Sequence, residues 1–312
     1  MKIMRIKRAL PKGVELENYT IEKTLGGGGF SIVYLATDRD NGEKVVIKEY
    51  MPMNHAKRSK DHSVGCGSEE SLRSFKIGFK RFIEEAGALA KLNHPNIVRV
   101  TNFFRANNTV YMVMTYEKGK DLRYYIKQYE GGLTEKFIRT VFPELLLGLQ
   151  ELHNNNLLHL DIKPANIFLR PGGKPLLLDF GAAREAAIDN RPNGPHTLTK
   201  GFAPIEQHQH KSVGPWSDFY ALGASMYACL TGKAPPPSTS RIKKDTLKPV
   251  ACTSFDRDYS PRLLETIDWC LELHHADRPQ SAEELLQMFQ QDVDTDESQP
   301  WYLAPIKLPW SK

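Results

Sequence analysis

The sequence predicts an α+β protein in which a small antiparallel sheet with one helix precedes a larger helical part. Residues 19–116 contain runs of β-branched and aromatic residues, and Gly, Asn or Asp residues separate these runs. From residue 121 onward, apolar residues recur at three- and four-residue steps, the spacing of amphipathic helices. A chain of 312 residues is long enough to form two compact units, each with its own core.

In the small part, the pattern predicts strands over residues 19–25, 31–38, 43–50, 97–104 and 109–116. One helix interrupts the series, because Phe79, Phe82, Ala86 and Leu89 keep helical spacing up to the breaker pair that begins at His94. Residues 51–74 are polar and bear Gly and Ser, so we expect a long irregular loop there.

In the larger part, apolar stripes predict helices over residues 121–129, 134–155, 216–231, 261–273 and 281–290. The short apolar runs 167–169 and 176–178 predict a small hairpin. The sequence therefore divides into an N-terminal extension 1–18, a small lobe 19–116 with the long insert 51–74, a large lobe 117–290 and a C-terminal tail 291–312.

Composition narrows the function classes. The net charge is only +5 and the basic residues are spread along the chain, so we do not expect nucleic-acid binding. The N-terminal residues lack the apolar core of a signal peptide, and no apolar run reaches the roughly 18 residues of a membrane span. The four cysteines are widely spaced, which is typical of reduced thiols, so we expect a cytoplasmic protein without a membrane partner.

A glycine-rich turn lies between the first two predicted strands. It consists of four consecutive glycines at residues 26–29, followed by Phe30. Without Cβ atoms, backbone N–H groups can approach a polyphosphate closely. Such a turn is also common as a plain hairpin turn, and the Walker pattern GxxxxGK[ST] is absent, so this turn alone leaves the function open.

The strand VVIK ends on Lys48. A lysine at a strand end is usually only solvated, but here it would lie beside the glycine turn, where an ammonium group could hold phosphate oxygens. Such a lysine needs a carboxylate to orient it. Glu85, on the predicted helix one turn before Leu89, is the candidate.

The strongest signal is the pair of segments HLDIKPAN and LDFG on either side of the predicted hairpin. They bring Asp161, Asn166 and Asp179 as oxygen donors, and Lys163 as a cation, into one pair of loops. Oxygen donors of this kind suit Mg²⁺ that also binds a substrate phosphate.

With these motifs in this order, the sequence resembles the eukaryotic-like protein kinase family, most closely its bacterial Ser/Thr members. The resemblance covers residues 19–290 and rests on the glycine turn, VVIK, HLDIKPAN, DFG and GFAPIEQ. It implies a bilobal protein kinase-like fold. It also implies an ATP- and Mg²⁺-dependent enzyme that transfers the γ-phosphoryl group of ATP to Ser or Thr hydroxyls of a protein substrate.

The resemblance assigns ATP contacts to residues of this sequence. Lys48, held by Glu85, would grip the α- and β-phosphates, while Val33 and Phe168 would sandwich the adenine. The other implied ATP-binding residues are Gly26, Gly27, Gly28, Gly29 and Phe30 of the turn, Met114, Thr115 and Glu117 along the adenine edge, and Asp121 at the ribose.

The resemblance also assigns the catalytic roles. Asp161 would orient the acceptor hydroxyl and take its proton, and Lys163 would neutralise charge on the transferred group. Asn166 and Asp179 would hold Mg²⁺.

Three further residues match structural positions of the family: Glu206 and Arg278 as a buried ion pair, and Asp218 as the brace of the catalytic loop. Thr197 and Thr199 are the candidate phosphorylation sites, and Thr199 together with Lys163-Pro164 indicates Ser/Thr specificity.

At Leu160 the sequence departs from the family, which usually has an arginine that pairs with an activation-loop phosphate. We therefore expect packing, rather than a phosphate at Thr197, to hold the activation segment.

Two other functions remain open at this point: a small-molecule phosphotransferase of the aminoglycoside-kinase type and a nucleotide-binding pseudokinase scaffold. The tail is a separate question. Six large apolar side chains between Trp301 and Trp310 predict that it docks back onto the kinase in cis or binds a partner, with plain disorder as the third interpretation.

Overall fold

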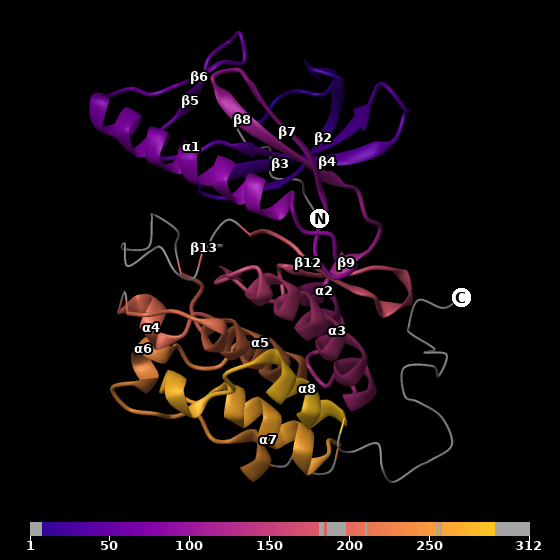
Figure 1. Cartoon of the computed structure of the whole chain (residues 1–312), viewed down its shortest axis with the longest axis vertical. Coiled ribbons are helices and arrows are strands. Elements are labelled where there is room, and N and C mark those ends of the chain that lie inside the picture. The colour runs from indigo at the N-terminus through magenta and orange to yellow at the C-terminus, as the bar shows by residue number, and fades with distance from the viewer. Residues whose placement is uncertain are drawn as a thin grey trace. The chain divides into compact units, whose positions relative to one another are not determined.

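The computed structural model describes residues 8–180, 184–185 (backbone only), 198–209, 211–253, 255 and 258–290. The chain divides into two compact units. The small unit comprises Met1–Asn93 and Val98–Glu117, and the large unit comprises His94–Ile97 and Lys118–Lys312. As the sequence predicts, the fold is that of a small antiparallel sheet with one long helix and a larger helical unit (Figure 1).

The small unit is built on a six-stranded sheet in the order β1-β2-β3-β4-β8-β7, with every neighbouring pair antiparallel. Its strands are β1 (Glu15–Leu16), β2 (Tyr19–Gly27), β3 (Ser31–Asp38), β4 (Lys44–Tyr50), β7 (Val100–Ala106) and β8 (Thr109–Thr115). The five predicted strands are confirmed. The sixth, β1, comes from the N-terminal extension and pairs with the start of β2.

One long helix, α1 (Glu69–Leu89), packs on this sheet (Figure 1). Its apolar stripe buries Phe75, Phe82, Ala86 and Leu89, which have the spacing that predicts the helix. The ring of Tyr50 on β4 lies 5.1 Å from the Phe75 ring, so the end of this strand packs against the same face of the helix.

The structure corrects the prediction of an irregular loop over residues 51–74. A short hairpin, β5 (Lys57–Arg58) and β6 (Val64–Gly65), lies in the middle of this segment. Helix α1 also begins ten residues before Phe79, where the Ser68 hydroxyl accepts a hydrogen bond from the backbone N–H of Ser71 and caps the first turn.

The large unit is mainly helical. Its α-helices are α2 (Leu122–Gln128), α3 (Glu135–Asn154), α4 (Ile205–His208), α5 (Pro215–Thr231), α6 (Ser238–Arg241), α7 (Pro261–Cys270) and α8 (Ala282–Gln290), and short 3₁₀ turns are η1 (Pro171–Gly173), η2 (Val250–Cys252) and η4 (His275–Asp277). The five predicted helices are present, although α7 ends at Cys270 rather than at residue 273. Helix α5 buries most of its residues, as expected for the central helix of this unit.

Short strands in the large unit position its loops. The predicted hairpin is β11 (Ile167–Leu169) with β12 (Pro175–Leu177), and β9 (Lys120–Asp121) pairs with β11 on its other side. Strand β10 (Leu157–Leu158) pairs with β13 (Arg184–Glu185). Gly119 precedes β9 with φ of 155°, and a Cβ there would lie 2.1 Å from the carbonyl oxygen of Leu169, so the chain needs glycine at this position.

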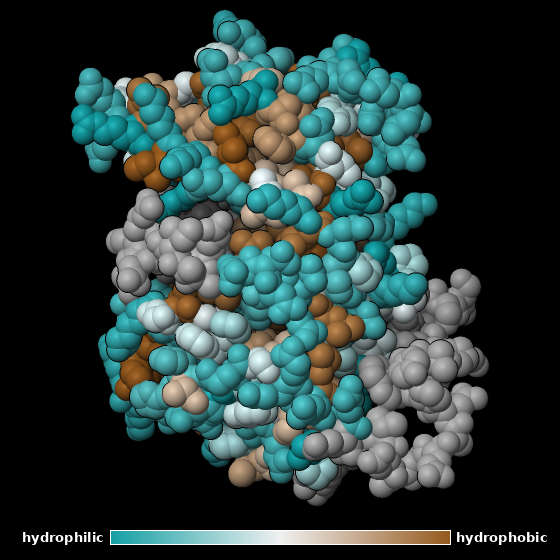
Figure 2. Space-filling view, viewed as in Figure 1, coloured by the Kyte–Doolittle hydropathy of each residue, from teal (hydrophilic) through white to brown (hydrophobic). Residues whose placement is uncertain are grey.

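The visible surface is mostly hydrophilic, with apolar side chains scattered singly or in small groups (Figure 2). Among the helices of the described residues, none is both long and apolar enough to span a bilayer.

Candidate active site

In the small unit, strand register brings the glycine turn next to Lys48. Gly26 pairs with Val33 across β2 and β3, and Val33 pairs with Lys48 across β3 and β4. Directly paired residues of an antiparallel sheet present their side chains on the same face, so Val33 and Lys48 are neighbours. No atom lies within 4 Å of the position a Cβ would take at Gly26, Gly28 or Gly29. This face of the turn is therefore open to a ligand that approaches the backbone.

Lys48 and Glu85 form the ion pair that their positions suggest. The Lys48 Nζ lies 3.0 Å from the Glu85 Oε1, and both side chains are 7% exposed. The ammonium group also lies 5.5 Å from the centre of the Phe82 ring. A lysine held by a buried carboxylate and an aromatic face has a defined position, as a phosphate ligand requires.

The other residues predicted to contact ATP lie in the two units separately. Met114 and Thr115 end strand β8 and are half-buried, and Glu117 follows them. In the large unit, Phe168 pairs directly with Asp121 across β11 and β9.

The Asp121 carboxylate, predicted to reach the ribose, already has protein partners. It caps α2 by accepting from the backbone N–H of Tyr124, and it pairs with Arg123 at 2.7 Å.

The catalytic-loop residues of the large unit converge on Asp161. Its two carboxylate oxygens lie 2.9 and 2.7 Å from the Lys163 Nζ. The Asn166 side-chain amide donates to Asp161 Oδ2 at 3.1 Å, and the Thr199 hydroxyl donates to Oδ1 at 3.1 Å. The carboxylate therefore has a fixed orientation and accepts a hydrogen bond from a hydroxyl group.

Asn166 and Leu178, the residue before Asp179, lie opposite each other at the open end of the β11–β12 hairpin. The backbone N–H of Leu178 donates to the carbonyl oxygen of Asn166 at 2.8 Å. Asp179, next in the chain, is exposed and has φ of 58°. The chain thus places Asn166 and Asp179 at the same end of the hairpin.

This donor set fits Mg²⁺. Within the described parts of the chain, no group of three or more His, Cys, Asp or Glu side chains could hold a metal ion by itself. Mg²⁺ usually takes one or two protein oxygens together with substrate phosphates, so Asp179 and Asn166 suit an ion that arrives with a nucleotide.

The buried Asp218 at the start of α5 holds the backbone of the catalytic loop. Its Oδ2 accepts from the backbone N–H of His159 at 2.9 Å, and its Oδ1 accepts from that of Leu160 at 2.8 Å. Leu160 has φ of 59°, a left-handed conformation that costs a non-glycine residue about 1–2 kcal/mol. The two hydrogen bonds to Asp218 offset this cost. Leu160 itself is buried. Packing of the activation segment, residues 179–206, stays a prediction, because most of that segment lies outside the described residues.

His159 links this loop to the segment of Asp179. Its Nδ1 accepts from the backbone N–H of Asp161 at 3.3 Å, so Nε2 carries the proton and donates to the carbonyl oxygen of Leu178 at 3.2 Å. The imidazole ring lies 4.5 Å from the Phe180 ring. A single buried ring therefore orients both loops.

Stability at acid pH is expected to depend on Asp218. Burial alone would raise the pKa of its carboxyl group. The hydrogen bond and charge of His153, together with the hydrogen bond from the backbone N–H of His159, instead lower this pKa below the usual 3.8. A carboxyl with a lowered folded-state pKa stabilises the protein above its unfolded-state pKa, and this contribution is lost as the pH falls through the folded-state value.

Chemical denaturation of wild type and Asp218→Asn should therefore show a stability difference that shrinks as the pH falls from about 5 to about 3. A difference that stays constant over this range would contradict the assignment.

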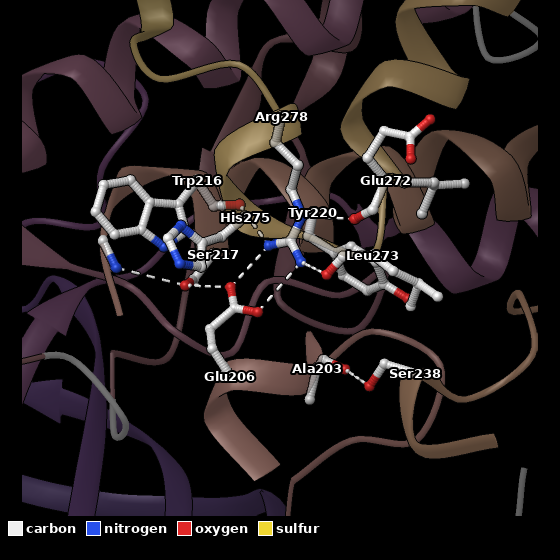
Figure 3. A network of polar contacts seen from close by, with 12 residues as sticks. Ala203, Glu206, Trp216, Ser217, Tyr220, Ser238, Glu272, Leu273, His275 and Arg278 are labelled. Carbon is white, nitrogen blue, oxygen red and sulfur yellow. Dashed lines mark hydrogen bonds and ion pairs between the residues drawn. The ribbon is translucent and has the colours of Figure 1, made fainter. Parts of the chain in front are cut away.

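Glu206 and Arg278 form a buried ion pair in the large unit (Figure 3). The guanidinium group lies 2.7 Å from Glu206 Oε1 and also donates to the carbonyl oxygens of Glu272 and Leu273. It stacks over the Tyr220 ring at 4.8 Å. Glu206 in turn accepts from the Ser217 hydroxyl at 2.8 Å. The pair ties α4, α5 and the turn before α8 together.

Sequence reasoning missed two groups of residues. Gln207, next to Glu206, donates through Nε2 to the carbonyl oxygen of Leu160 at 2.9 Å and so supports the catalytic loop. In the small unit, the buried Glu49 pairs with Arg58. The available signal was a carboxylate directly after the apolar run 45–47 and Lys48, in a predicted strand. Thr197, the other candidate phosphorylation site, lies outside the described residues.

Known proteins are similar to this chain in sequence and in fold. The model of the protein kinase domain family matches residues 19–289. The serine/threonine-protein kinase PknA of Nostoc is 30% identical over 286 residues, which are 88% of this chain and 47% of that protein. The serine/threonine-protein kinase pkn3 of Myxococcus xanthus is 30% identical over 85% of this chain and 48% of its own length. The chain thus spans about half the length of these curated relatives.

A solved structure described as "PpkA-294 apo form" is 35% identical, with a TM-score of 0.80. The match covers 91% of this chain and all of that one. The expected kinase-like fold is thereby confirmed. Because the family model spans most of the sequence and relatives share its motifs over most of its length, the chain belongs to the protein kinase domain family.

Proposed function

We propose that this chain is a serine/threonine protein kinase that transfers the γ-phosphoryl group of ATP to protein hydroxyls. The observation that carries the proposal is the Asp161 carboxylate, held by Lys163 and Asn166 and already accepting a hydrogen bond from the hydroxyl of Thr199. The relatives named as serine/threonine-protein kinases support the same activity.

Each residue then has a chemical task. Lys48, oriented by Glu85, would hold phosphate oxygens, and the open backbone of the glycine turn would donate N–H groups to them. Asp161 would accept a hydrogen bond from the substrate hydroxyl and take its proton as the new bond to the γ-phosphorus forms and the bond from that phosphorus to the leaving ADP breaks. The Lys163 ammonium, 2.7 Å from that carboxylate, would lie close to the transferred group and stabilise its charge.

Asn166 and Asp179 would hold the cofactor Mg²⁺, which when bound neutralises charge on the phosphates of ATP. The wide spacing of the four cysteines supports a cytoplasmic location. For the tail, residues 291–312, the apolar side chains between Trp301 and Trp310 support docking in cis or on a partner.

The activity is tested by incubation with labelled ATP, Mg²⁺ and two panels of acceptors, Ser/Thr peptides and aminoglycosides. Transfer to peptides in the presence of Mg²⁺ is the expected result. Transfer to aminoglycosides alone would favour the small-molecule phosphotransferase, and ATP binding without any transfer would favour the pseudokinase scaffold.

The large unit has a groove beside the catalytic loop that suits a peptide. It has a volume of about 520 Å³, and its apolar lining includes Pro164, which follows Lys163, and Phe202, three residues after Thr199. Lys127 and Lys233 also line it, together with Glu130 and with Arg123, whose charge the Asp121 carboxylate compensates. The positive charge favours a substrate that carries acidic side chains near the acceptor hydroxyl.

Substrate selection should respond to reversal of these charges. The variant K127E/K233E is expected to lose the preference for Glu-containing over Lys-containing Ser/Thr peptides by about tenfold in kcat/KM, because two favourable charge pairs become repulsive. The control is Lys136→Glu, an exposed charge on α3 outside the groove. Equal peptide preference in the wild type and K127E/K233E would refute this role of the groove.

A further inference from the structure

A buried polar network lies around Glu49 in the small unit, and neither the catalytic residues nor the ATP contacts use it. Glu49 is fully buried and accepts hydrogen bonds from the hydroxyls of Tyr34 and Tyr111, both at 2.7 Å. It also pairs with Arg58 of the hairpin β5–β6 at 2.5 Å. A buried carboxylate with three partners holds those partners firmly, because losing any one of them would leave the charge poorly compensated.

This network reaches the N-terminal extension through Arg58. The Arg58 Nε donates to the carbonyl oxygen of Arg8 at 2.6 Å, and its Nη1 donates to that of His62 at 2.8 Å. The backbone N–H of Leu10 donates to the Tyr34 hydroxyl at 3.1 Å. Residues 8–10 are therefore hydrogen-bonded to two partners of Glu49, Arg58 and Tyr34.

Arg8 in turn is hydrogen-bonded to the segment that follows β4. Its guanidinium group donates to the carbonyl oxygens of Met53 and Ala56, at 2.5 and 2.6 Å. A single Nη1 atom makes both bonds, so one charged group fixes the positions of two carbonyl oxygens in the turn over residues 53–56.

The same segment holds the glycine turn. The backbone N–H of Met51 donates to the carbonyl oxygen of Phe30, and that of Met53 donates to the carbonyl oxygen of Gly29, both at 2.8 Å. At Gly28 and Gly29 the space beside the backbone is open, so packing does not support this part of the turn. Hydrogen bonds from residues 51 and 53 thus restrain a backbone that its sequence leaves flexible.

We propose that Arg8 and the Glu49–Arg58 pair are positioning residues for the glycine turn, acting through the segment 51–56. The role in ATP binding rests on the proposed function. The hairpin β5–β6 and residues 8–10 form a brace that keeps the Gly29 and Phe30 carbonyls in place, and with them the N–H groups of the turn. Loss of the brace leaves Lys48 and Glu85 in position but lets the turn sample other conformations, so it weakens ATP binding more than it slows transfer.

The test compares Arg8→Ala with Arg39→Ala. Arg39 is the control in the same unit: like Arg8 it donates to a backbone carbonyl, in its case that of Glu17, and it pairs with Glu15 rather than with the segment 51–56. Hydrogen exchange of the amides over residues 26–31 and calorimetric titration with MgATP are measured on the full chain.

Arg8→Ala is expected to exchange faster over residues 26–31 and to raise the Kd for ATP about tenfold, with kcat at saturating ATP changed less than twofold. Arg8→Lys, which keeps a cationic donor, should recover most of the affinity, and Arg39→Ala should match the wild type in both measurements. Glu49→Gln provides a second, independent break of the brace and should shift both readouts in the same direction as Arg8→Ala.

The proposal would be overturned if Arg8→Ala and Glu49→Gln both matched the wild type in hydrogen exchange over residues 26–31 and in ATP affinity. Equal changes in Arg39→Ala would also overturn it, since they would indicate general loosening of the unit. If the wild type binds ATP but phosphorylates no peptide, the proposed function is wrong. Hydrogen exchange over residues 26–31 and the Kd for ATP then still test whether the brace positions the glycine turn.

Discussion

Asp161→Ala is expected to lower phosphoryl transfer more than 100-fold while the Kd for ATP stays near its wild-type value. The carboxylate lies where Lys163, Asn166 and Thr199 meet, and alanine leaves no group there to orient the acceptor hydroxyl or take its proton. A positioned base contributes typically 10²–10⁴-fold to the rate. The measurement is single-turnover transfer from labelled ATP to a Ser/Thr peptide, with ATP binding measured in parallel by calorimetry.

The matched control is Asp40→Ala, which removes a carboxylate from an exposed turn of the small unit, where it accepts a hydrogen bond from the Asn18 side-chain amide. It should leave transfer unchanged. Transfer by Asp161→Ala at the wild-type rate would remove the basis of the proposed activity. Loss of ATP binding together with transfer would instead show that Asp161 supports the fold of the site.

Arg278→Met is expected to destabilise the large unit by about 3–5 kcal/mol, the usual cost of removing one partner from a buried ion pair. Arg278 is fully buried and compensates the Glu206 carboxylate, which is itself 2% exposed (Figure 3). Methionine fills part of the volume but removes the cation that compensates this carboxylate, and it leaves the carbonyl oxygens of Glu272 and Leu273 without the guanidinium donor. Urea denaturation followed by circular dichroism provides the free energy of unfolding.

The double variant Glu206→Gln with Arg278→Met should recover part of this loss, because it removes the uncompensated buried charge. Arg39→Met serves as the surface control, since its pair with Glu15 is exposed and such pairs contribute only about 0–1 kcal/mol. Equal losses in the free energy of unfolding for Arg278→Met and Arg39→Met would show that the buried pair stabilises the protein no more than the exposed one.

Much of the architecture could be predicted because it depends on short-range patterns. The β-branched and aromatic runs of β2, β3 and β4 and the apolar stripes of α3 and α8 lie within each segment, so each element can be identified without knowing its neighbours. The same holds for the catalytic loop, where Asp161, Lys163 and Asn166 lie within six residues and contact one another directly.

The elements that were missed have little local signal. The first turns of α1 are polar and exposed, and Leu72 is 41% exposed, so no apolar stripe marks them. The Ser68 cap and the two acidic residues of the first turn start the helix there instead. Strands β5 and β6 have two residues each, too few to show any period, and Arg58 is held by a carboxylate on β4.

The sequence by itself determined the two-part α+β organisation, the order of the motifs and the candidate catalytic set, because these depend on residue type and on spacing along the chain. Only the tertiary structure decided which charged side chains are buried and what compensates them: Glu49 by Arg58, Asp218 by the backbone of the catalytic loop, and Glu206 by Arg278. A charge can be buried only where its partners come together, and those partners lie 9, 59 and 72 residues away along the chain.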